Sequence, residues 1–472
     1  VMMTVPSKLD YSAELIGGQN CTTIDKFPVI IYAHAVTADR ASGIALATAM
    51  AVNCYVTVAI DLPLHGVAPI SNGRDGIGGE NIFFGFNVEH GDLGYAENAK
   101  LDSTFNNIEE RHRNLAAQAG TNARVAMDFD GTDGTPALGN SGSFFFNIGT
   151  LGRLRDNIRQ GVVDLIHLNA TLGSIDLNDD GTPDLDVDKV YVAGSSLGAM
   201  VSAAFVAVNN QEAVQSKNPN LPKIQGVVLS SPGGALPKIL ENSPAITTRI
   251  LGGLNLAQDE SNLQKYQSML QAALNSADVI NFADLLREDA TPVLMYSMIG
   301  GGDCPAFNSE TGTCSDRSDR IPSSFIKAFG GVYPPDHVVP NDDYFKFAET
   351  NPYVNILPEL TYELNGTPTN LKHNEPSGDA LTGSTPLAEQ MGLTQVNTTN
   401  IDTVKFNKKA YIPFEKGSHV TFITSDDNAT FSTMMAQMVS FFSTNGAALN
   451  LEPEFIDGIA TEQTGYAPVE GE

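Results

Sequence analysis

Six short apolar runs, separated by stretches with helical periodicity, constrain the fold of this chain more than any other feature. Each run is five to seven residues long without regular polar alternation, as is typical of strands buried on both faces of a parallel sheet. The runs are 28–33, 55–60, 189–193, 226–230, 292–298 and 410–414. Helical patterns occupy 41–52, 154–169, 197–209 and 429–443. This alternation predicts an α/β fold with a doubly wound, mostly parallel sheet.

Three stretches interrupt the alternation and are predicted to be insertions at the ends of the sheet. The first, about 67–151, is rich in Gly, Asn and Asp; the second, about 233–288, has an amphipathic helical pattern; the third, about 351–403, is polar with strand-like pieces. Long insertions in α/β enzymes usually form lids or binding surfaces. We therefore expect one catalytic domain over 1–449, followed by an acidic tail at 450–472.

The charge balance excludes one class of partner. With 27 basic and 55 acidic residues, the formal net charge is −28. Nucleic-acid binding needs a basic face, and no run of the sequence supplies one. One uncharged stretch, 41–60, changes midway from Ala-rich to β-branched, so it predicts a helix followed by a strand rather than a membrane span. No signal peptide is visible and the sequence starts at Val1, so we expect that a leader or an upstream domain was removed.

The four cysteines predict two disulfides. Cys304 and Cys314 flank a polar loop and are expected to pair locally, which leaves Cys21 to pair with Cys54. Buried free thiols are the alternative in a chain of this length. Disulfides would indicate an oxidising compartment.

A tight corner joins one apolar run to the next helical pattern in K-V-Y-V-A-G-S-S-L-G-A-M-V, which begins at Lys189. Gly194, Ser196 and Gly198 form a G-x-S-x-G pentapeptide there, with Ser195 at its variable position. In α/β-hydrolases this strand–turn–helix context is the nucleophile elbow, whose strained turn raises the serine above the sheet and leaves no room for a side chain at either glycine. We therefore predict an α/β-hydrolase fold with large lid or cap insertions and Ser196 as the nucleophile.

A serine nucleophile needs a base, which in this fold follows it in the chain after the acid. Three histidines follow Ser196, namely His337, His373 and His419. His419 lies in F-E-K-G-S-H-V-T-F, just beyond a predicted strand and before the last predicted helix. A doubly wound sheet presents such a loop at its active edge, so His419 is the expected base. His373 fits a solvated loop.

Several carboxylates compete for the role of the acid. Asp303 ends the run T-P-V-L-M-Y-S-M-I-G-G-G-D, but it adjoins Cys304 and an expected disulfide loop. Asp336 lies in P-P-D-H-V-V-P, an arrangement found after the corresponding strand in many hydrolases of this fold. We favour Asp336 over Asp303, with Asp342 and Asp343 as the remaining alternatives.

Ester hydrolysis also needs backbone donors for the developing oxyanion, commonly the N–H after the nucleophile and one from the loop after the third strand. The first is Leu197. The second is Val36 or Ala35 in Y-A-H-A-V-T-A-D-R. Ala35 stands where hydrolases usually have glycine, which departs from their pattern. The side chain of His34 is expected to be structural rather than catalytic.

Several motifs together resemble the bacterial virulence-factor lipases, which are secreted or outer-membrane α/β-hydrolases. They are D-L-P-L-H-G (61–66), S-G-S-F-F-F-N (141–147), R-D-N-I-R-Q-G (155–161), the elbow, D-H-V-V-P-N (336–341) and the final G-S-H (417–419). The resemblance covers about 1–444. It implies a secreted, periplasmic or outer-membrane carboxylester hydrolase acting on lipids, lysophospholipids or small acyl esters through Ser196, Asp336 and His419. Such proteins often carry a further N-terminal region.

A separate loop predicts a structural calcium site. The segment 176–184 has oxygen-bearing side chains at positions 1, 3, 5 and 9 and glycine at position 6, as in calcium loops of the EF-hand type. The expected ligands are Asp176, Asn178, Asp180, the backbone carbonyl of Thr182, and Asp184. Position 12 is Val187, so Asp186 or Asp188 would have to replace the usual glutamate. The looser cluster of Asp128, Asp130 and Asp133 favours a solvated loop.

These features favour a serine carboxylester hydrolase, either a lipase, an esterase or a lysophospholipase, that works through an acyl-enzyme and needs no catalytic cofactor. The apolar segment 236–254 is expected either to cover an acyl pocket or meet a lipid surface, or else to pack on the core. A polyester depolymerase or peptidase is the alternative on the same fold. From another class, the chain would be a non-catalytic, calcium-stabilised surface module.

Overall fold

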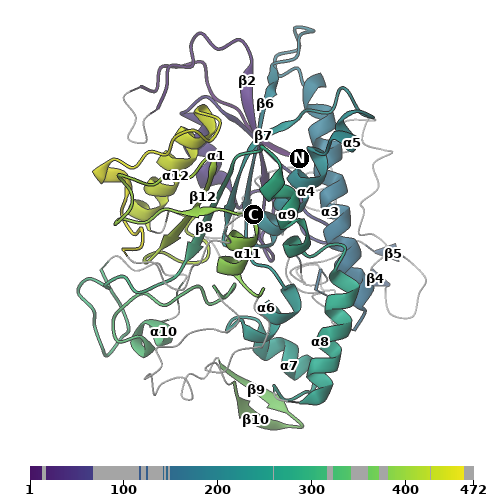
Figure 1. Ribbon diagram of the computed structural model, residues 1–472, viewed down its shortest axis with the longest axis vertical. Helices are drawn as coiled ribbons and strands as arrows, with labels where there is room; N and C mark the ends of the chain where they lie inside the picture. Colours follow the sequence, from purple (N-terminus) through teal and green to yellow (C-terminus); the bar gives the residue numbers. More distant parts are fainter. Residues whose placement is uncertain are drawn as a thin grey trace.

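The computed structural model places a twisted sheet between two layers of helices (Figure 1). It describes residues 1–12, 18–66, 116–117, 124–125, 142, 145–146, 149–258, 260–315, 321, 323–341, 360–371, 381–425 and 427–461. Most of the first predicted insertion, together with His373, Asp342, Asp343 and the Asp128 cluster, lies outside these residues.

Eight strands form the main sheet in the order β1-β3-β2-β6-β7-β8-β12-β11. Their bounds are β1 (Met2–Thr4), β2 (Phe27–Ala33), β3 (Val56–Ala59), β6 (Leu185–Ser195), β7 (Ile224–Ser230), β8 (Val293–Met298), β11 (Thr394–Gln395) and β12 (Lys409–Phe414). Only β1 is antiparallel to its neighbour, and the other seven strands are parallel. All six predicted runs are strands, and the mostly parallel α/β-hydrolase sheet is confirmed.

Helices cover both faces of the sheet, as the doubly wound prediction requires (Figure 1). On one face, α1 (Ile44–Ala51) and α12 (Asn428–Ser443) pack against Ile30, Tyr296 and other residues of one apolar cluster. On the other face, α3 (Leu151–Thr171) and α4 (Leu197–Asn209) pack on a second cluster. Helix α3 buries one stripe of side chains, whereas α4 is buried on nearly every side and is accordingly rich in Ala and Val.

The second predicted insertion is helical, as expected. It contains α6 (Leu236–Asn242), α7 (Thr247–Leu254), α8 (Ser261–Leu274), the 3-10 turn η3 (Val279–Phe282) and α9 (Ala283–Glu288). Leu236, Ile239 and Leu240 are buried in the main core. Leu251 belongs instead to a smaller apolar cluster with α10 (Ser323–Ala328) and β9 (Thr361–Leu364), which pairs with β10 (Thr367–Asn370). This smaller cluster lies at the bottom of Figure 1.

Four further elements are short. They are β4 (Ala116–Ala117), which pairs with β5 (Arg124–Val125), the turn η2 (Leu172–Ser174) and α5 (Glu212–Gln215).

The structure differs from the sequence-based boundaries in two places. The end of the third predicted insertion is part of the core, because α11 (Ser384–Gln390) leads into β11, which pairs with β12. The expected tail packs on the domain up to 461: the turn η6 (Pro453–Phe455) contacts α12, and Ile459 is buried beside Phe414. Ile456 and Ile459 give this segment enough apolar surface to be held against the apolar cluster of α1 and α12.

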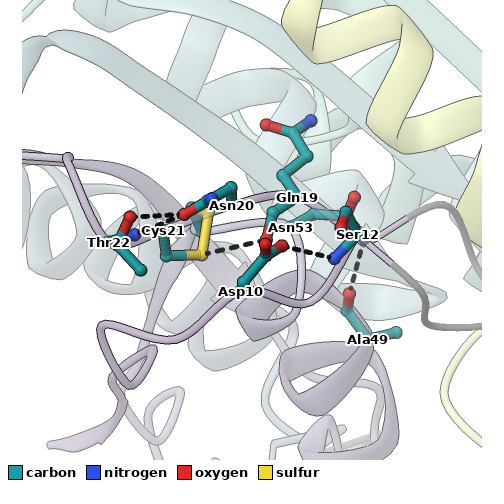
Figure 2. The surroundings of a disulfide bond; sticks show 9 residues. Asp10, Ser12, Gln19, Asn20, Cys21, Thr22, Ala49 and Asn53 are labelled. Atoms are coloured by element: carbon teal, nitrogen blue, oxygen red, sulfur yellow. Dashed lines mark hydrogen bonds between the residues drawn. A yellow bond between two sulfur atoms is a disulfide. The ribbon is translucent and has the colours of Figure 1, made fainter.

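Both predicted disulfides are confirmed, Cys21–Cys54 and Cys304–Cys314. The first ties the N-terminal segment to the turn after α1. Figure 2 shows how local hydrogen bonds shape this region: the hydroxyl of Thr22 donates to Asn20 at 2.6 Å, and the amide of Asn53 donates to the carbonyl of Ala49 at 3.0 Å. Among the described residues, no helix has both the length and the apolar character needed to cross a bilayer.

Candidate active site

Ser196 occupies a strained turn between β6 and α4. Its φ and ψ are 55° and −120°, a region that residues other than glycine rarely adopt. Its N–H donates to the carbonyl of Ser230 on the neighbouring strand at 2.8 Å. A Cβ added at Gly194 would lie 2.7 Å from the Cα of Ala199, and one at Gly198 would lie 2.1 Å from the carbonyl oxygen of Ala33. The local geometry is therefore that of the predicted elbow.

Asp336 and His419 meet at the same end of the sheet. His419 follows β12, and its Nδ1 lies 2.6 Å from Oδ2 of Asp336, which follows β8. The other carboxylate oxygen accepts the N–H groups of Val338 and Val339 at 2.8 and 3.1 Å. Burial by itself raises the pKa of Asp336, but His419 outweighs it through charge and hydrogen bonding and leaves the pKa below its ordinary value. Asp336 is therefore held as an ionised hydrogen-bond acceptor.

The three predicted catalytic residues lie at the carboxyl ends of neighbouring parallel strands, β6, β8 and β12, with β7 between the first two. Ser196, Asp336 and His419 are 3%, 3% and 6% exposed. Among the described residues, Asp336 is the one hydrogen-bond partner of the His419 side chain. The Ser196 hydroxyl is not hydrogen-bonded to His419 here, as is common before substrate binds.

The alternative candidates for the acid and base lie elsewhere or outside the described residues. Asp303 is exposed five positions beyond the end of β8, where it forms an isolated bridge with Val332 rather than a contact with His419. His337 adjoins Asp336, but its half-buried ring packs 5.5 Å from that of Phe325. Burial lowers the pKa of His337 to about 4, although the negative charge of Asp336 acts to raise it.

The two predicted oxyanion donors lie on either side of the elbow. Leu197 is the first residue of α4, so its N–H has no acceptor within the helix. Val36 lies in the loop after β2, and its N–H donates to no group that the structure describes. The adjacent Thr37 has a φ of 62°. Sequence reasoning missed two residues that hold this loop, Arg40 and Asp61; the signal for them was an acidic residue directly after an apolar strand.

The predicted calcium loop is organised around Asp176. Its carboxylate accepts the N–H groups of Asn178, Asp180 and Gly181, at 3.2, 3.3 and 2.7 Å. Gly181 has a φ of 88°, which explains glycine at the sixth position. Asp184 accepts the N–H of Leu177 at 2.7 Å and the side-chain amide of Asn178 at 3.4 Å. Within the described ranges, no group of three or more His, Cys, Asp or Glu side chains is arranged to hold a metal ion.

Comparisons with known proteins add little to this geometry. No protein-family model and no curated protein matches the chain. Solved structures do match. Acetyl xylan esterase 1 from a Thermoanaerobacterium species is 15% identical, with a TM-score of 0.27 over 58% of this chain and 61% of that one. Esterase B from Lactobacillus rhamnosis is 10% identical, with a TM-score of 0.27 over 63% and 66%.

A third match is an S-formylglutathione hydrolase from Agrobacterium tumefaciens, 13% identical with a TM-score of 0.24 over 64% of this chain and 69% of that one. This chain thus spans less than two thirds of the first two proteins. TM-scores this low carry no argument about function, and the fold rests on the strand order. The resemblance to virulence-factor lipases stays a prediction.

Proposed function

We propose that this protein is a serine carboxylester hydrolase. The observation that carries the proposal is the hydrogen bond between Asp336 and His419 at the sheet edge where the strained turn holds Ser196. A base oriented by a buried carboxylate, next to a serine on an elbow, is the arrangement that activates a hydroxyl for acyl transfer.

The contacts give each residue a role in this proposed reaction. Because Nδ1 of His419 faces Asp336, its Nε2 is the atom that accepts the Ser196 proton as the hydroxyl oxygen attacks the ester carbonyl. The N–H groups of Leu197 and Val36 bind the oxyanion. His419 then gives the proton to the departing alcohol. Water, deprotonated by the same ring, hydrolyses the acyl-enzyme.

The packing of the cap favours esters of small acyl groups over lipid surfaces as substrates. Leu236, Ile239, Leu240 and Leu251 in the segment 236–254 are buried. Within the described structure, every large apolar side chain that is exposed lies outside this segment. A lipase would therefore have to open the cap to present an apolar surface, and micellar substrate would then raise its rate. Unchanged specific activity across the critical micelle concentration is expected for the esterase.

A fluorophosphonate probe and p-nitrophenyl esters from acetate to palmitate test the proposal. We expect the probe to modify Ser196, located by peptide mass spectrometry, and the Ser196→Ala variant to lose both labelling and hydrolysis. Ser195→Ala is the matched control, because its buried hydroxyl has no hydrogen-bond partner in the described structure. Ester hydrolysis retained by Ser196→Ala overturns the assignment. Labelling of Ser196 without ester hydrolysis favours a peptidase or polyester depolymerase, and no labelling favours the non-catalytic module.

We further propose that the loop 176–184 binds calcium as a structural ion and that the protein works in an oxidising compartment outside the cytoplasm, whether secreted, periplasmic or on an outer membrane. The turn at Gly181 and the carboxylate of Asp176 support the first proposal. The two disulfides support the second.

A further inference from the structure

The loop that carries Val36 is tied to a second segment of the chain. It joins β2 to α1, and Thr37 within it has a φ of 62°, a backbone conformation that is strained for a β-branched residue. Within the loop, the N–H of Ala38 donates to the carbonyl of Ala35 at 3.2 Å, and the N–H of Ser42 donates to the carbonyl of Asp39 at 3.1 Å. Contacts with residues outside the loop add to these internal bonds.

The first such contact is made by His34 at the start of the loop. Its Nε2 accepts the N–H of Leu62 at 2.9 Å, so the ring proton is on Nδ1, which donates to the carbonyl of Ala35 at 2.8 Å. His34 is fully buried. Burial, helped by the ring of His65 at 4.8 Å, lowers the pKa of His34 to about 3. The ring is therefore neutral at any pH at which an ester hydrolase works, and both hydrogen bonds persist.

The second contact is made by Arg40 at the other end of the loop. Its backbone N–H donates to Oδ1 of Asp61 at 2.8 Å, and its guanidinium Nη1 donates to Oδ2 of the same carboxylate. The side chains of Arg40 and Asp61 are 8% and 16% exposed. Asp61 directly precedes Leu62. The Asp61–Leu62 dipeptide after β3 therefore hydrogen-bonds to both ends of the loop, to Arg40 and to His34.

The start of the loop also presses against the elbow. Gly198 leaves no room for a Cβ between α4 and the carbonyls of Ala33 and His34, which lie 2.1 and 2.4 Å from that position. The two proposed donors, Leu197 and Val36, are thus placed on segments in direct contact. Their separation is fixed from one side by this contact and from the other by the Asp61–Leu62 dipeptide.

We propose that His34 and the Arg40–Asp61 ion pair are positioning residues that hold the Val36 N–H in place for the oxyanion. The inference rests on the proposed hydrolase function. None of the three touches the reacting atoms. They act by keeping a strained donor loop in one conformation before substrate arrives, so that no reorganisation is needed as charge develops on the carbonyl oxygen.

The test compares kcat, KM and the affinity for a trifluoromethyl ketone, which forms an anionic adduct with the serine. His34→Leu removes both loop contacts, whereas His34→Gln keeps one donor and one acceptor. Asp61→Asn keeps an acceptor for the Arg40 N–H but removes the charge. We expect His34→Leu and Asp61→Asn to lower kcat roughly 10- to 100-fold and to weaken the affinity for the ketone by a similar factor. KM should stay within about threefold of the wild-type value. His34→Gln should recover most of the loss.

A matched control separates positioning from a general loss of stability. Asn169 lies on α3, and Asn169→Ala removes the buried hydrogen bonds that its side-chain amide donates to Asn209 and to the carbonyl of Pro222. It should lower the unfolding temperature without changing kcat or ketone affinity. The proposal is overturned if His34→Leu stays folded with wild-type ketone affinity, or if Asn169→Ala loses kcat equally.

Failure of the proposed function is distinguishable from failure of this inference. If the wild-type protein neither reacts with a fluorophosphonate nor hydrolyses esters, both ideas are overturned. If Ser196 is labelled and esters are hydrolysed while the variants keep wild-type kcat, the positioning role alone is overturned.

Discussion

Nδ1 of His419 lies 2.6 Å from the carboxylate of Asp336, although 83 residues separate the two in the chain. The other oxygen of that carboxylate accepts the N–H groups of Val338 and Val339, so both oxygens of Asp336 are held by hydrogen bonds. With Nδ1 bound to Asp336, His419 has Nε2 as its one remaining ring nitrogen.

Replacing this acid should cost the most activity of any substitution outside Ser196 and His419. In Asp336→Asn the amide would stabilise the wrong histidine tautomer, and we expect kcat to fall by about 10⁴. The measurement is p-nitrophenyl acetate hydrolysis. Asp303→Asn is the control, because Asp303 is exposed and the described hydrogen bond of the His419 side chain goes to Asp336, and it should keep wild-type kcat. The reverse ranking would identify Asp303 as the acid.

The elbow should not tolerate a methyl group at Gly198. In Gly198→Ala the new Cβ would lie 2.1 Å from the carbonyl oxygen of Ala33 on central strand β2, which has no room to move. We expect the free energy of unfolding in urea to fall by more than about 4 kcal/mol, or soluble protein to be lost. Gly152→Ala, near the start of α3 with its nearest atom at 3.7 Å, should be neutral or stabilising by up to about 1 kcal/mol. Equal effects at both sites would refute this account.

The two disulfides should contribute unequally to stability. Cys21–Cys54 spans 33 residues and Cys304–Cys314 spans 10. By loop-closure entropy, paired Cys→Ala substitution should cost about 4 kcal/mol for the first and about 3 kcal/mol for the second. Urea unfolding of both double variants checks the order. A larger loss for the short loop would mean that native packing rather than chain entropy sets its contribution.

Acid should destabilise the protein through His34. Its pKa is about 3 in the folded state and about 6.5 when unfolded, so between these values the unfolded chain binds the additional proton. The free energy of unfolding therefore falls as pH drops from about 6.5 toward 3, by up to about 1.4 kcal/mol per pH unit for this group. His34→Gln should make the decline shallower in urea unfolding at pH 7, 6, 5 and 4. His167→Gln, exposed on α3, should leave the slope unchanged, and identical slopes in all three proteins would contradict the prediction.

Calcium should raise the unfolding temperature if the loop 176–184 binds it. Millimolar calcium added to chelator-treated protein is expected to raise the transition by several degrees, since an ion that binds only the folded state stabilises it by mass action. Asp176→Asn should abolish the shift. Glu212→Ala, which removes an acidic side chain from α5, should retain it. No shift in the wild-type protein would leave the loop as an acidic turn shaped by hydrogen bonds to Asp176.

Local constraints made much of the fold predictable. Strands buried on both faces need continuous apolar runs, so all six runs are strands, and helix 197–209 has the predicted bounds. A turn too tight for a Cβ needs glycine, so the G-x-S-x-G pattern located Ser196. Strands β1 and β11 were missed because two or three residues carry no such pattern; they exist through pairing with β3 and β12.

The sequence by itself determined the α/β class, the elbow serine, the cysteine pairing and a histidine after the last long strand, because each follows from short-range pattern or elimination. Only the tertiary structure decided which carboxylate meets His419, since Asp303 and Asp336 both follow β8 and differ in how the chain turns back to the sheet. It alone also placed Asp61 and Leu62 against the two ends of the Val36 loop. Contacts between segments distant in the chain depend on strand order and packing, which no local pattern encodes.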